Sequence, residues 1–568
     1  MPRNESEAPV QAEGELGLRA GASLFFGISL DSEFSGNSPL VLLHPGSSEK
    51  QSLIHKILIK VGIPAISPNS HSPPESMDSL LLLCARRIVA QRPLPALPAD
   101  LYPVLFQAAF LDGKPLVLQD LVATWPFPVL NLQRLVGCRE LLPGHTCFKS
   151  VKAVIQAVVA QLCRELEKPG SHSSLRVLDM TMLPDSESCH TPIGMKTWCS
   201  TRDLAEACVE VFKHQQEFQR CRSKHDKACS GADMATAALQ CPGVDIYADL
   251  SVIRWSYRML LDALQIGAAG LLRLKCREFQ VENISAPEIV TLLKSLDPSC
   301  LRRVDLCCNY FGLTGLSVIL PHLSRFPELR SLKLQDNWLD VRHLTPKSGV
   351  TIRCVAQQLG MLPSLRELNL AISRLSGNLH QILCDLQAPL ESLELPFCYL
   401  LSADLAFLSQ SIHAPALKRL DLSGHDISQG LLEPLQLLLE KTSASLLYLD
   451  LTDCHVDDSH LNALLPTLLR CSRLRFLGLR INPLSMAALK DLLQKTLELP
   501  DLHVVVYPVP KDCCKRALPG FVSNFVIDRE LLSAATAEIS QLLANSWRTD
   551  LDWTCAPVGC KAMDYFLL

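Results

Sequence analysis

The amino-acid sequence predicts an α/β fold: a leucine-rich repeat solenoid, or horseshoe, with parallel strands on its concave face and helices on its convex face. The first observation is a signature, L-x-x-L-x-L-x-x-N/C-x-L, that recurs up to Tyr507 at spacings of 25 to 29 residues, with one spacing of 36. The second is the helical spacing of apolar residues between the signatures, as in residues 461–469. The copies begin at Leu301, Leu329, Leu365, Leu390, Leu417, Leu446, Leu474 and Leu502.

The strand part of each copy indicates which side chains face a partner. Its leucines point into the solenoid, and the residues between them point out to the concave face. The Asn or Cys of the signature stands where the chain turns, and we expect its side chain to satisfy backbone groups that no neighbouring strand reaches. Aromatic and arginine side chains dominate many interfaces, although outward residues can also form a merely solvated face. The candidates for partner contact are Phe397, Tyr448, Asp450, Phe476 and Arg480.

Composition and charge favour protein partners. The chain has 568 residues, a formal net charge of −4 and a pI near 6.5, so it carries no basic field for nucleic acid. No apolar run reaches the roughly 18 residues of a membrane-spanning helix, and residues 24–30 lack the flanks of a signal peptide. The 23 cysteines fall mostly inside apolar repeat positions and not in a disulfide framework. We therefore expect a cytoplasmic protein with neither a nucleic-acid nor a membrane ligand.

The pattern along the chain divides it into five regions. Residues 1–76 are rich in Ser, Pro, Gly and Glu and predict a disordered extension, so Met77, where the helical pattern starts, is a candidate initiator. Residues 77–170 predict an α-helical N-terminal module. Residues 171–300 predict early irregular repeats, with strands near Leu175 and Leu271 and an insertion loop at about 213–243. Regular repeats at 301–510 and a C-terminal cap at 511–568 complete the chain.

Two motifs in the N-terminal module look like adaptor-binding boxes of ubiquitin ligases. Residues 79–88 fit S-L-x-x-x-C-x-x-x-Φ and residues 97–105 fit Φ-P-x-x-Φ-x-x-x-Φ, like an elongin-binding BC box followed by a cullin-2 box. Helix positions i, i+4 and i+8 form one apolar stripe, which can dock in a partner's groove or pack in the core of its own chain. The candidate residues are Leu80, Cys84, Ile88, Leu97, Pro98, Leu101 and Leu105.

The first box has low specificity by itself. Residues 295–304 match it equally well, although Pro298 interrupts a helix there, so we attribute that match to chance. Residues 97–106 also resemble the start of an F-box, which recruits a different adaptor to a different cullin. Three interpretations stay open: an elongin and cullin-2 box pair, an F-box, and plain structural helices.

No motif indicates catalysis or a cofactor. The sequence has no phosphate-binding Gly-rich loop, no H-E-x-x-H and no G-x-S-x-G. Cys221, His225 and Cys229 offer three metal ligands without a fourth, which favours a solvated loop. The cysteines at 513, 514, 555 and 560 are expected to be structural thiols. We therefore expect a non-enzymatic chain without catalytic residues, metal or cofactor.

Several segments are more distinctive than the repeat consensus. They include residues 101–110, the Thr-Trp-Pro-Phe-Pro run at 124–128 and the Asp-Tyr-Phe run at 564–566. Together with the strands that begin at Leu175, Leu301 and Leu390, they resemble the PRAME family over residues 77–568.

This resemblance implies a cytoplasmic regulator that works by binding. Similar proteins restrain Toll-like-receptor signalling to NF-κB: they bind the beta catalytic subunit of the inhibitor-of-κB kinase and disturb assembly of the kinase core complex. Family relatives also act as substrate receptors of cullin-2 ubiquitin ligases, so a receptor that binds elongin B and elongin C is the alternative expectation.

Overall fold

The computed structural model describes residues 75–137, 145–168, 173–181, 200–226, 242–342, 346–516, 525–548 and 550–555. The predicted extension at 1–76 lies outside these ranges except for Glu75 and Ser76, which begin a helix. The run at 564–566 and the cysteines at 229 and 560 also lie outside them.

A thirteen-stranded parallel sheet runs through the described residues, with its strands side by side in chain order. Most strands have three residues, because each L-x-L pairs with its neighbour and the chain then turns away. Its strands are β1 (Val129–Asn131), β2 (Val177–Asp179), β3 (Val244–Val252), β4 (Leu272–Val281), β5 (Arg303–Asp305), β6 (Ser331–Lys333), β7 (Glu367–Asn369), β8 (Ser392–Glu394), β9 (Arg419–Asp421), β10 (Tyr448–Asp450), β11 (Phe476–Gly478), β12 (Val504–Val506) and β15 (Asp552–Thr554).

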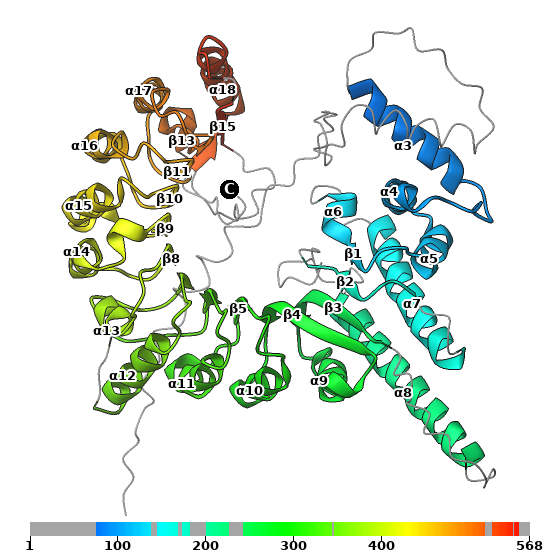
Figure 1. Cartoon of the computed structure of the whole chain (residues 1–568). Coiled ribbons are helices and arrows are strands. Elements are labelled where there is room, and N and C mark those ends of the chain that lie inside the picture. The colour runs from blue at the N-terminus through cyan, green and yellow to red at the C-terminus, as the bar shows by residue number, and fades with distance from the viewer. Residues whose placement is uncertain are drawn as a thin grey trace, which may run out of the picture. The chain divides into compact units, whose positions relative to one another are not determined.

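Helices of the regular repeats cover one face of this sheet, and none of the described helices of these repeats lies on the opposite, concave face (Figure 1). Each helix packs on the helix of the next repeat along most of this series. The arrangement confirms the predicted leucine-rich repeat solenoid. These helices are α10 (Ala286–Ser295), α11 (Gly312–Leu323), α12 (Pro346–Gly360), α13 (Leu379–Leu383), α14 (Ser402–Gln410), α15 (Leu432–Thr442), α16 (Asp458–Leu468) and α17 (Met486–Thr496); short 3-10 turns are η4 (Ala414–Ala416) and η5 (Ile427–Gln429).

The core of the sheet is a continuous row of central strand residues. In register from β4 to β15, each strand places one apolar side chain beneath the sheet, and all of them are buried. Because every repeat buries its row residue only against its neighbours, stability accumulates along the stack. The row consists of Phe279, Val304, Leu332, Leu368, Leu393, Leu420, Leu449, Leu477, Val505 and Trp553.

The signature Asn, Cys or His bonds to backbone groups at the turn after most strands of the regular repeats, as the sequence predicts. After β7 this position holds Ser373, whose buried hydroxyl has no hydrogen-bond partner within the described residues. Asn482 accepts hydrogen bonds from the backbone N–H groups of Cys454 (3.0 Å) and Val456 (2.9 Å). Its Nδ2 donates to the carbonyls of Leu451 (2.8 Å) and Leu479 (2.9 Å). The side chains of Asn309, Asn337, Cys398, His425 and Cys454 bond to backbone groups in equivalent places.

The N-terminal module is mostly helical, as predicted, and packs around one tryptophan. Trp125, from the Thr-Trp-Pro-Phe-Pro run, is buried, and its indole N–H donates to the Val129 carbonyl (3.2 Å). The rings of Tyr102, Phe106 and Phe127 meet it edge-on at centroid distances of 5.9, 5.6 and 5.7 Å. The elements of this module are α3 (Glu75–Val89), η2 (Ala99–Leu101), α4 (Tyr102–Leu111), α5 (Pro115–Ala123), α6 (Leu132–Val136) and α7 (His145–Glu167). The residues between the module and the regular repeats form α8 (Ser200–Asp226), α9 (Tyr257–Ile266) and η3 (Gly267–Ala269).

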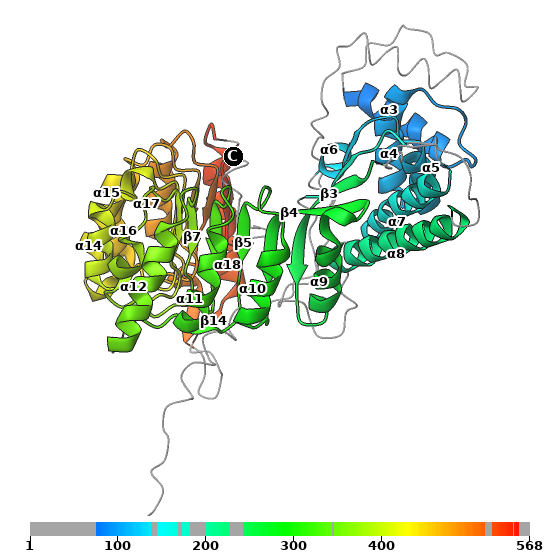
Figure 2. The ribbon, with the colours of Figure 1, turned by 60° about the horizontal axis from the view of Figure 1, so that its bottom comes forward.

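Two boundaries differ from the sequence expectation. The sheet begins at β1, inside the region expected to be an α-helical module. The sequence did not indicate this strand, because three residues are too few to show a strand period. Residues 213–226, expected in an irregular loop, continue α8. The first half of α8 buries the apolar stripe of Leu204, Cys208 and Val211, and α8 lies beside α7 (Figure 2). Because this half is already helical, the helix continues into the polar residues that follow, which are good helix formers.

The C-terminal segment caps the last repeat. Strand β15 adds to β12 in parallel register, and Arg548 donates to the carbonyls of Leu499 (2.6 Å) and Leu502 (2.5 Å). The other elements of the cap are η6 (Lys511–Cys513), the antiparallel pair β13 (Cys514–Arg516) and β14 (Phe525–Ile527), and α18 (Arg529–Ala544).

Replacement of a turn asparagine should cost far more than replacement of an exposed one. Asn482→Ala removes the five hydrogen bonds of this side chain and leaves two buried N–H groups without their acceptor, so we expect the free energy of unfolding to fall by roughly 2–4 kcal/mol. Asn462→Ala, at an exposed position of α16, should change it by less than about 0.5 kcal/mol. Urea denaturation of both variants measures the two effects, and equal effects would contradict this account of the turn.

His413 should make stability fall in mild acid. Burial lowers the pKa of its imidazole to about 4, and its Nδ1 accepts from the Leu390 N–H (3.1 Å), which requires the neutral ring. Because the folded pKa lies below the unfolded value of about 6.5, this stabilisation is complete above pH 6.5 and is lost as pH falls toward 4. The loss amounts to roughly 3 kcal/mol.

The measurement compares wild type with His413→Asn by urea denaturation from pH 7.5 to 4.5. We expect the stability difference between them to shrink in acid, because the amide does not titrate. A pH-independent difference would contradict this account, because it would show that burial of His413 carries no cost that depends on protonation.

Candidate protein-binding surface

Three side chains at one register form a layered stack on the concave face. Arg419, Tyr448 and Phe476 are direct neighbours on β9, β10 and β11. The Tyr448 and Phe476 rings are parallel, with centroids 4.2 Å apart and planes inclined by 4°, and the Arg419 guanidinium lies 4.1 Å from the Tyr448 centroid. The layers support one another, because a cation on an aromatic face is attracted by the ring electrons.

Carboxylates flank this stack on the same strands. Arg419 forms an ion pair with Glu394 of β8 (3.3 Å), and the Tyr448 hydroxyl donates to Asp450 (3.2 Å). Asp421 lies in register between Glu394 and Asp450, and burial together with the Asp450 charge raises the pKa of Asp421. We call these six residues, Glu394, Arg419, Asp421, Tyr448, Asp450 and Phe476, the β8–β11 cluster.

Part of the acidic character of the cluster has a structural cause. Asp421 accepts the backbone N–H of Ser423 (3.0 Å), and Asp450 accepts that of Thr452 (3.0 Å). Each carboxylate therefore helps to turn the chain at the end of its strand, in addition to facing the concave side.

The five predicted contact residues thus fall into two groups. Tyr448, Asp450 and Phe476 come together in the β8–β11 cluster, where Phe476 is only 7% exposed beside the Tyr448 ring. Phe397 and Arg480 lie in the turns after β8 and β11; Phe397 has a φ of 55° and its ring packs against Gly424. The sequence pattern places Arg419 at an outward strand position, but Arg419 was not among the predicted contact residues, although its register with Tyr448 follows from aligning the copies.

The turns after the strands expose a second set of aromatics that the sequence did not indicate. Tyr310 and Trp338 follow β5 and β6 with φ values of 54° and 55°, and their ring centroids are 5.0 Å apart. Trp338 is 68% exposed. Left-handed backbone is uncommon for such residues, so sequence pattern alone does not place them.

The adaptor-box residues lie on α3, η2, α4 and the segment before η2, and most of them face inward. Cys84 and Ile88 are 6% and 4% exposed, and Leu101 and Leu105 are fully buried, so the two helices pack through these side chains. Leu80, Leu97 and Pro98 are half-buried, whereas Leu83 is 57% exposed. A partner that uses the buried stripe requires α3 to separate from α4.

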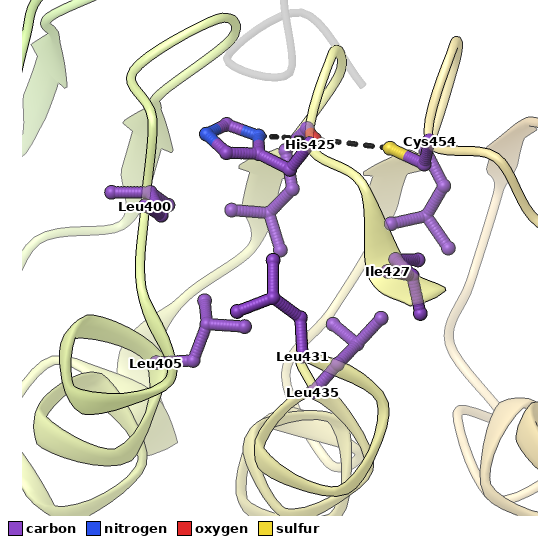
Figure 3. Close-up of a pocket in the computed structure, with 9 residues that line it drawn as sticks. Leu400, Leu405, His425, Ile427, Leu431, Leu435 and Cys454 are labelled. Carbon is purple, nitrogen blue, oxygen red and sulfur yellow. Dashed lines mark hydrogen bonds between the residues drawn. The ribbon is translucent and has the colours of Figure 1, made fainter. Parts of the chain in front are cut away.

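The interior offers no comparable ligand site in the described residues. A small gap between repeats is lined mainly by leucines, and its polar members are bonded internally: His425 Nδ1 and Cys454 Sγ both donate to the Leu422 carbonyl, at 2.7 and 3.2 Å (Figure 3). No three His, Cys, Asp or Glu side chains gather as metal ligands in the part of the chain that the structure describes. None of its described helices is long and apolar enough to cross a membrane.

The described residues include only some of the cysteines whose roles the sequence predicted. Cys221 is exposed on α8, and the other two members of its trio have no described side chain. Burial raises the pKa of both the Cys513 and the Cys514 thiols, which does not favour reactive thiolates.

Among solved structures, a crystal structure of a Rad7 and Elc1 complex from yeast aligns with 90% of this chain and 98% of that chain, at 13% identity and a TM-score of 0.41. The leucine-rich repeat-containing protein LegL7 from Legionella pneumophila aligns with 53% of this chain and 92% of that chain, at 19% identity and a TM-score of 0.29.

Sequence comparison extends over nearly the whole described chain. Leucine-rich repeat-containing protein 14 from Xenopus laevis is 42% identical over 503 residues, which cover 84% of this chain and 97% of that protein. The Homo sapiens protein of the same name is 40% identical over 514 residues, which cover 87% of this chain and 100% of that protein. The PRAME N-terminal domain matches residues 79–186 and the PRAME C-terminal domain matches residues 260–563. The chain is a repeat scaffold that carries both PRAME domains. It therefore belongs to the PRAME family.

Proposed function

We propose that this chain is a non-enzymatic regulator that restrains Toll-like-receptor signalling to NF-κB. In this proposal it binds the beta subunit of the inhibitor-of-κB kinase through its concave face and so prevents assembly of the kinase core complex. Membership of the PRAME family and 40–42% identity to proteins named leucine-rich repeat-containing protein 14 support the proposal.

The β8–β11 cluster is the reason for choosing the concave face as the binding surface. Its aromatic rings and guanidinium are held by stacking, by an ion pair and by strands of one sheet. Binding to such a surface loses little side-chain entropy, because the side chains are already ordered. Tyrosine and arginine are also the residue types that most often dominate interface energies.

A second candidate function is a substrate receptor of a cullin-2 ligase that binds elongin B and elongin C. Its supporting observation is that the two boxes form successive packed helices, with Leu83 exposed and Leu80 half-buried on α3. The burial of Cys84 and Ile88 weighs against it in this conformation. A docking face would then use Leu83 and its neighbours, while the stripe holds the module together.

Kinase binding should depend on the concave face and not on the helical face. We expect Tyr448→Ala/Arg480→Ala to weaken binding of the purified kinase beta subunit by about tenfold or more in biolayer interferometry. Leu437→Ala/Arg470→Ala removes one exposed leucine and one exposed arginine from the helical side of this part of the solenoid and should change affinity less than about twofold.

Two outcomes would count against this proposal in different ways. Equal affinities of both double variants and wild type would place the contact elsewhere on the chain. No binding of the beta subunit to the wild-type chain would remove the kinase from the proposal.

The ligase alternative is best tested at Leu83. Cys84→Asp would bury a charge in the core, so loss of binding in that variant would have no clear meaning. If the chain is a ligase receptor, Leu83→Asp should abolish capture of elongin C and cullin-2 in pull-downs, and Leu116→Asp, at an exposed leucine of α5, should not. The kinase proposal predicts that both variants bind the beta subunit as wild type does.

A further inference from the structure

Four arginines stand at one register at the edge where the chain enters the concave face: Arg277 lies within β4, and the others immediately precede β5, β6 and β7. The backbone N–H of Arg302 donates to the carbonyl of Arg277 (2.9 Å), that of Arg330 to Arg302 (2.8 Å), and that of Arg366 to Arg330 (2.8 Å). Since neighbouring strands lie about 4.8 Å apart, the four side chains start about 5 Å from one another. We call Arg277, Arg302, Arg330 and Arg366 the arginine ladder.

Like charges at neighbouring sheet positions destabilise a fold unless counter-charges neutralise them. The exposed Arg302 makes no ion pair within the described residues. The carboxylate beside Arg330, Glu328, is 3.9 Å away, and both side chains are half-exposed. Arg366 donates to the carbonyls of Pro363 (3.1 Å) and Leu365 (2.8 Å). The fold thus leaves most of this charge available to a ligand.

Arg277 is held differently, at the end of the ladder. Its guanidinium lies 5.4 Å from the ring centroid of Tyr247, and it donates to the Thr181 hydroxyl (3.3 Å). Both contacts fix the side chain without cancelling its charge.

Neighbouring side chains add positive charge beside the ladder, and acidic side chains on the next strands limit how far this basic zone extends. We consider the ladder position of each strand and the two outward strand positions after it. On β4–β7 these positions hold six cationic and three carboxylate side chains; on β8–β10 they hold two cationic and four carboxylate side chains. The basic zone therefore spans four strands, or about 15 Å, and an acidic zone follows it.

We propose that the arginine ladder binds an acidic polypeptide segment in helical form. Guanidinium groups recognise carboxylates through paired charge-assisted hydrogen bonds. Glutamates three or four residues apart on a helix are separated by about 4.5–6 Å, which fits the ladder spacing, whereas same-face residues of an extended chain are about 6.7 Å apart. A nucleic-acid backbone fits less well, because its charge would continue into the acidic zone of β8–β10.

This inference deepens the proposed function, since it names the chemistry of the segment that the concave face would hold. It can be tested without the kinase. The probe is a fluorescent alanine-based helical peptide of roughly 17 residues with Glu at every fourth position, and the control peptide has Gln at those positions.

The test variant is Arg302→Gln/Arg330→Gln/Arg366→Gln. We expect fluorescence anisotropy to show about tenfold or greater weakening of Glu-peptide binding, because three exposed charge pairs are lost. The matched control, Arg87→Gln/Arg353→Gln/Arg473→Gln, removes three exposed arginines elsewhere and changes the net charge equally, so binding should fall less than about twofold. Added salt should weaken wild-type binding more than binding to the ladder variant.

Several outcomes would overturn the inference: equal loss in the two triple variants, equal binding of the Glu and Gln peptides, or no binding of the Glu peptide to wild type. Tighter ladder-dependent binding of a single-stranded RNA oligonucleotide would replace it with a polyphosphate site. Circular dichroism checks the fold of each variant, and Arg330→Gln alone serves if the triple variant is unfolded. Whether or not the peptide binds, the kinase-binding measurement tests the proposed function separately.

Discussion

Hydrogen bonding at the turn after each strand is the constraint on which the rest of the structure depends. A strand of three residues pairs for only a short distance, so the chain that leaves it carries backbone groups into the core without a sheet partner. Asn482 and Asn337 bond to these groups from within the core. Because this closure recurs in most regular copies, the strands stay in register and outward residues of successive copies become neighbours.

The concave face depends directly on that register. Tyr448 lies against Phe476 because their copies enter the sheet at the same point, and the same rule places Arg419 over Tyr448. Some of the polar side chains there also serve the backbone: Asp421 and Asp450 each turn the chain after their strand. Acidic charge on this face therefore has a structural explanation, whereas the arginines before β5, β6 and β7 have no equivalent backbone role common to all three.

Much of the fold was predictable from the sequence, because the repeat signature states both the period and the inward leucines. The strands at Val177 and Arg303, the helix around Leu461 and the role of the turn asparagines follow from it. The start of the sheet did not, since β1 is only three residues long, directly follows Pro128 and shows no period. The polar half of α8 was not predicted either, because it is helical through continuation of the buried half and has no apolar period of its own.

The candidate site was less predictable than the fold. The outward positions were known, but which of them touch depends on alignment between copies, as for Arg419 and Tyr448. Cys84 and Ile88 illustrate the opposite difficulty: an apolar stripe has the same pattern whether it faces a partner or α4, and only packing decides. Tyr310 and Trp338 reach the surface through left-handed turns, a conformation that their residue types do not suggest.

The addition of β15 to β12 affects the tendency of the last repeat to pair with other chains. An open parallel sheet ends in a strand whose N–H and C=O groups can pair with any other chain. A segment from the far C-terminal side of α18 occupies that position, and Arg548 fastens it to the last repeat. A chain that lost this segment, through proteolysis or premature termination, would present β12 as a template for intermolecular pairing. The edge of β12 is therefore covered only after synthesis has reached Thr554.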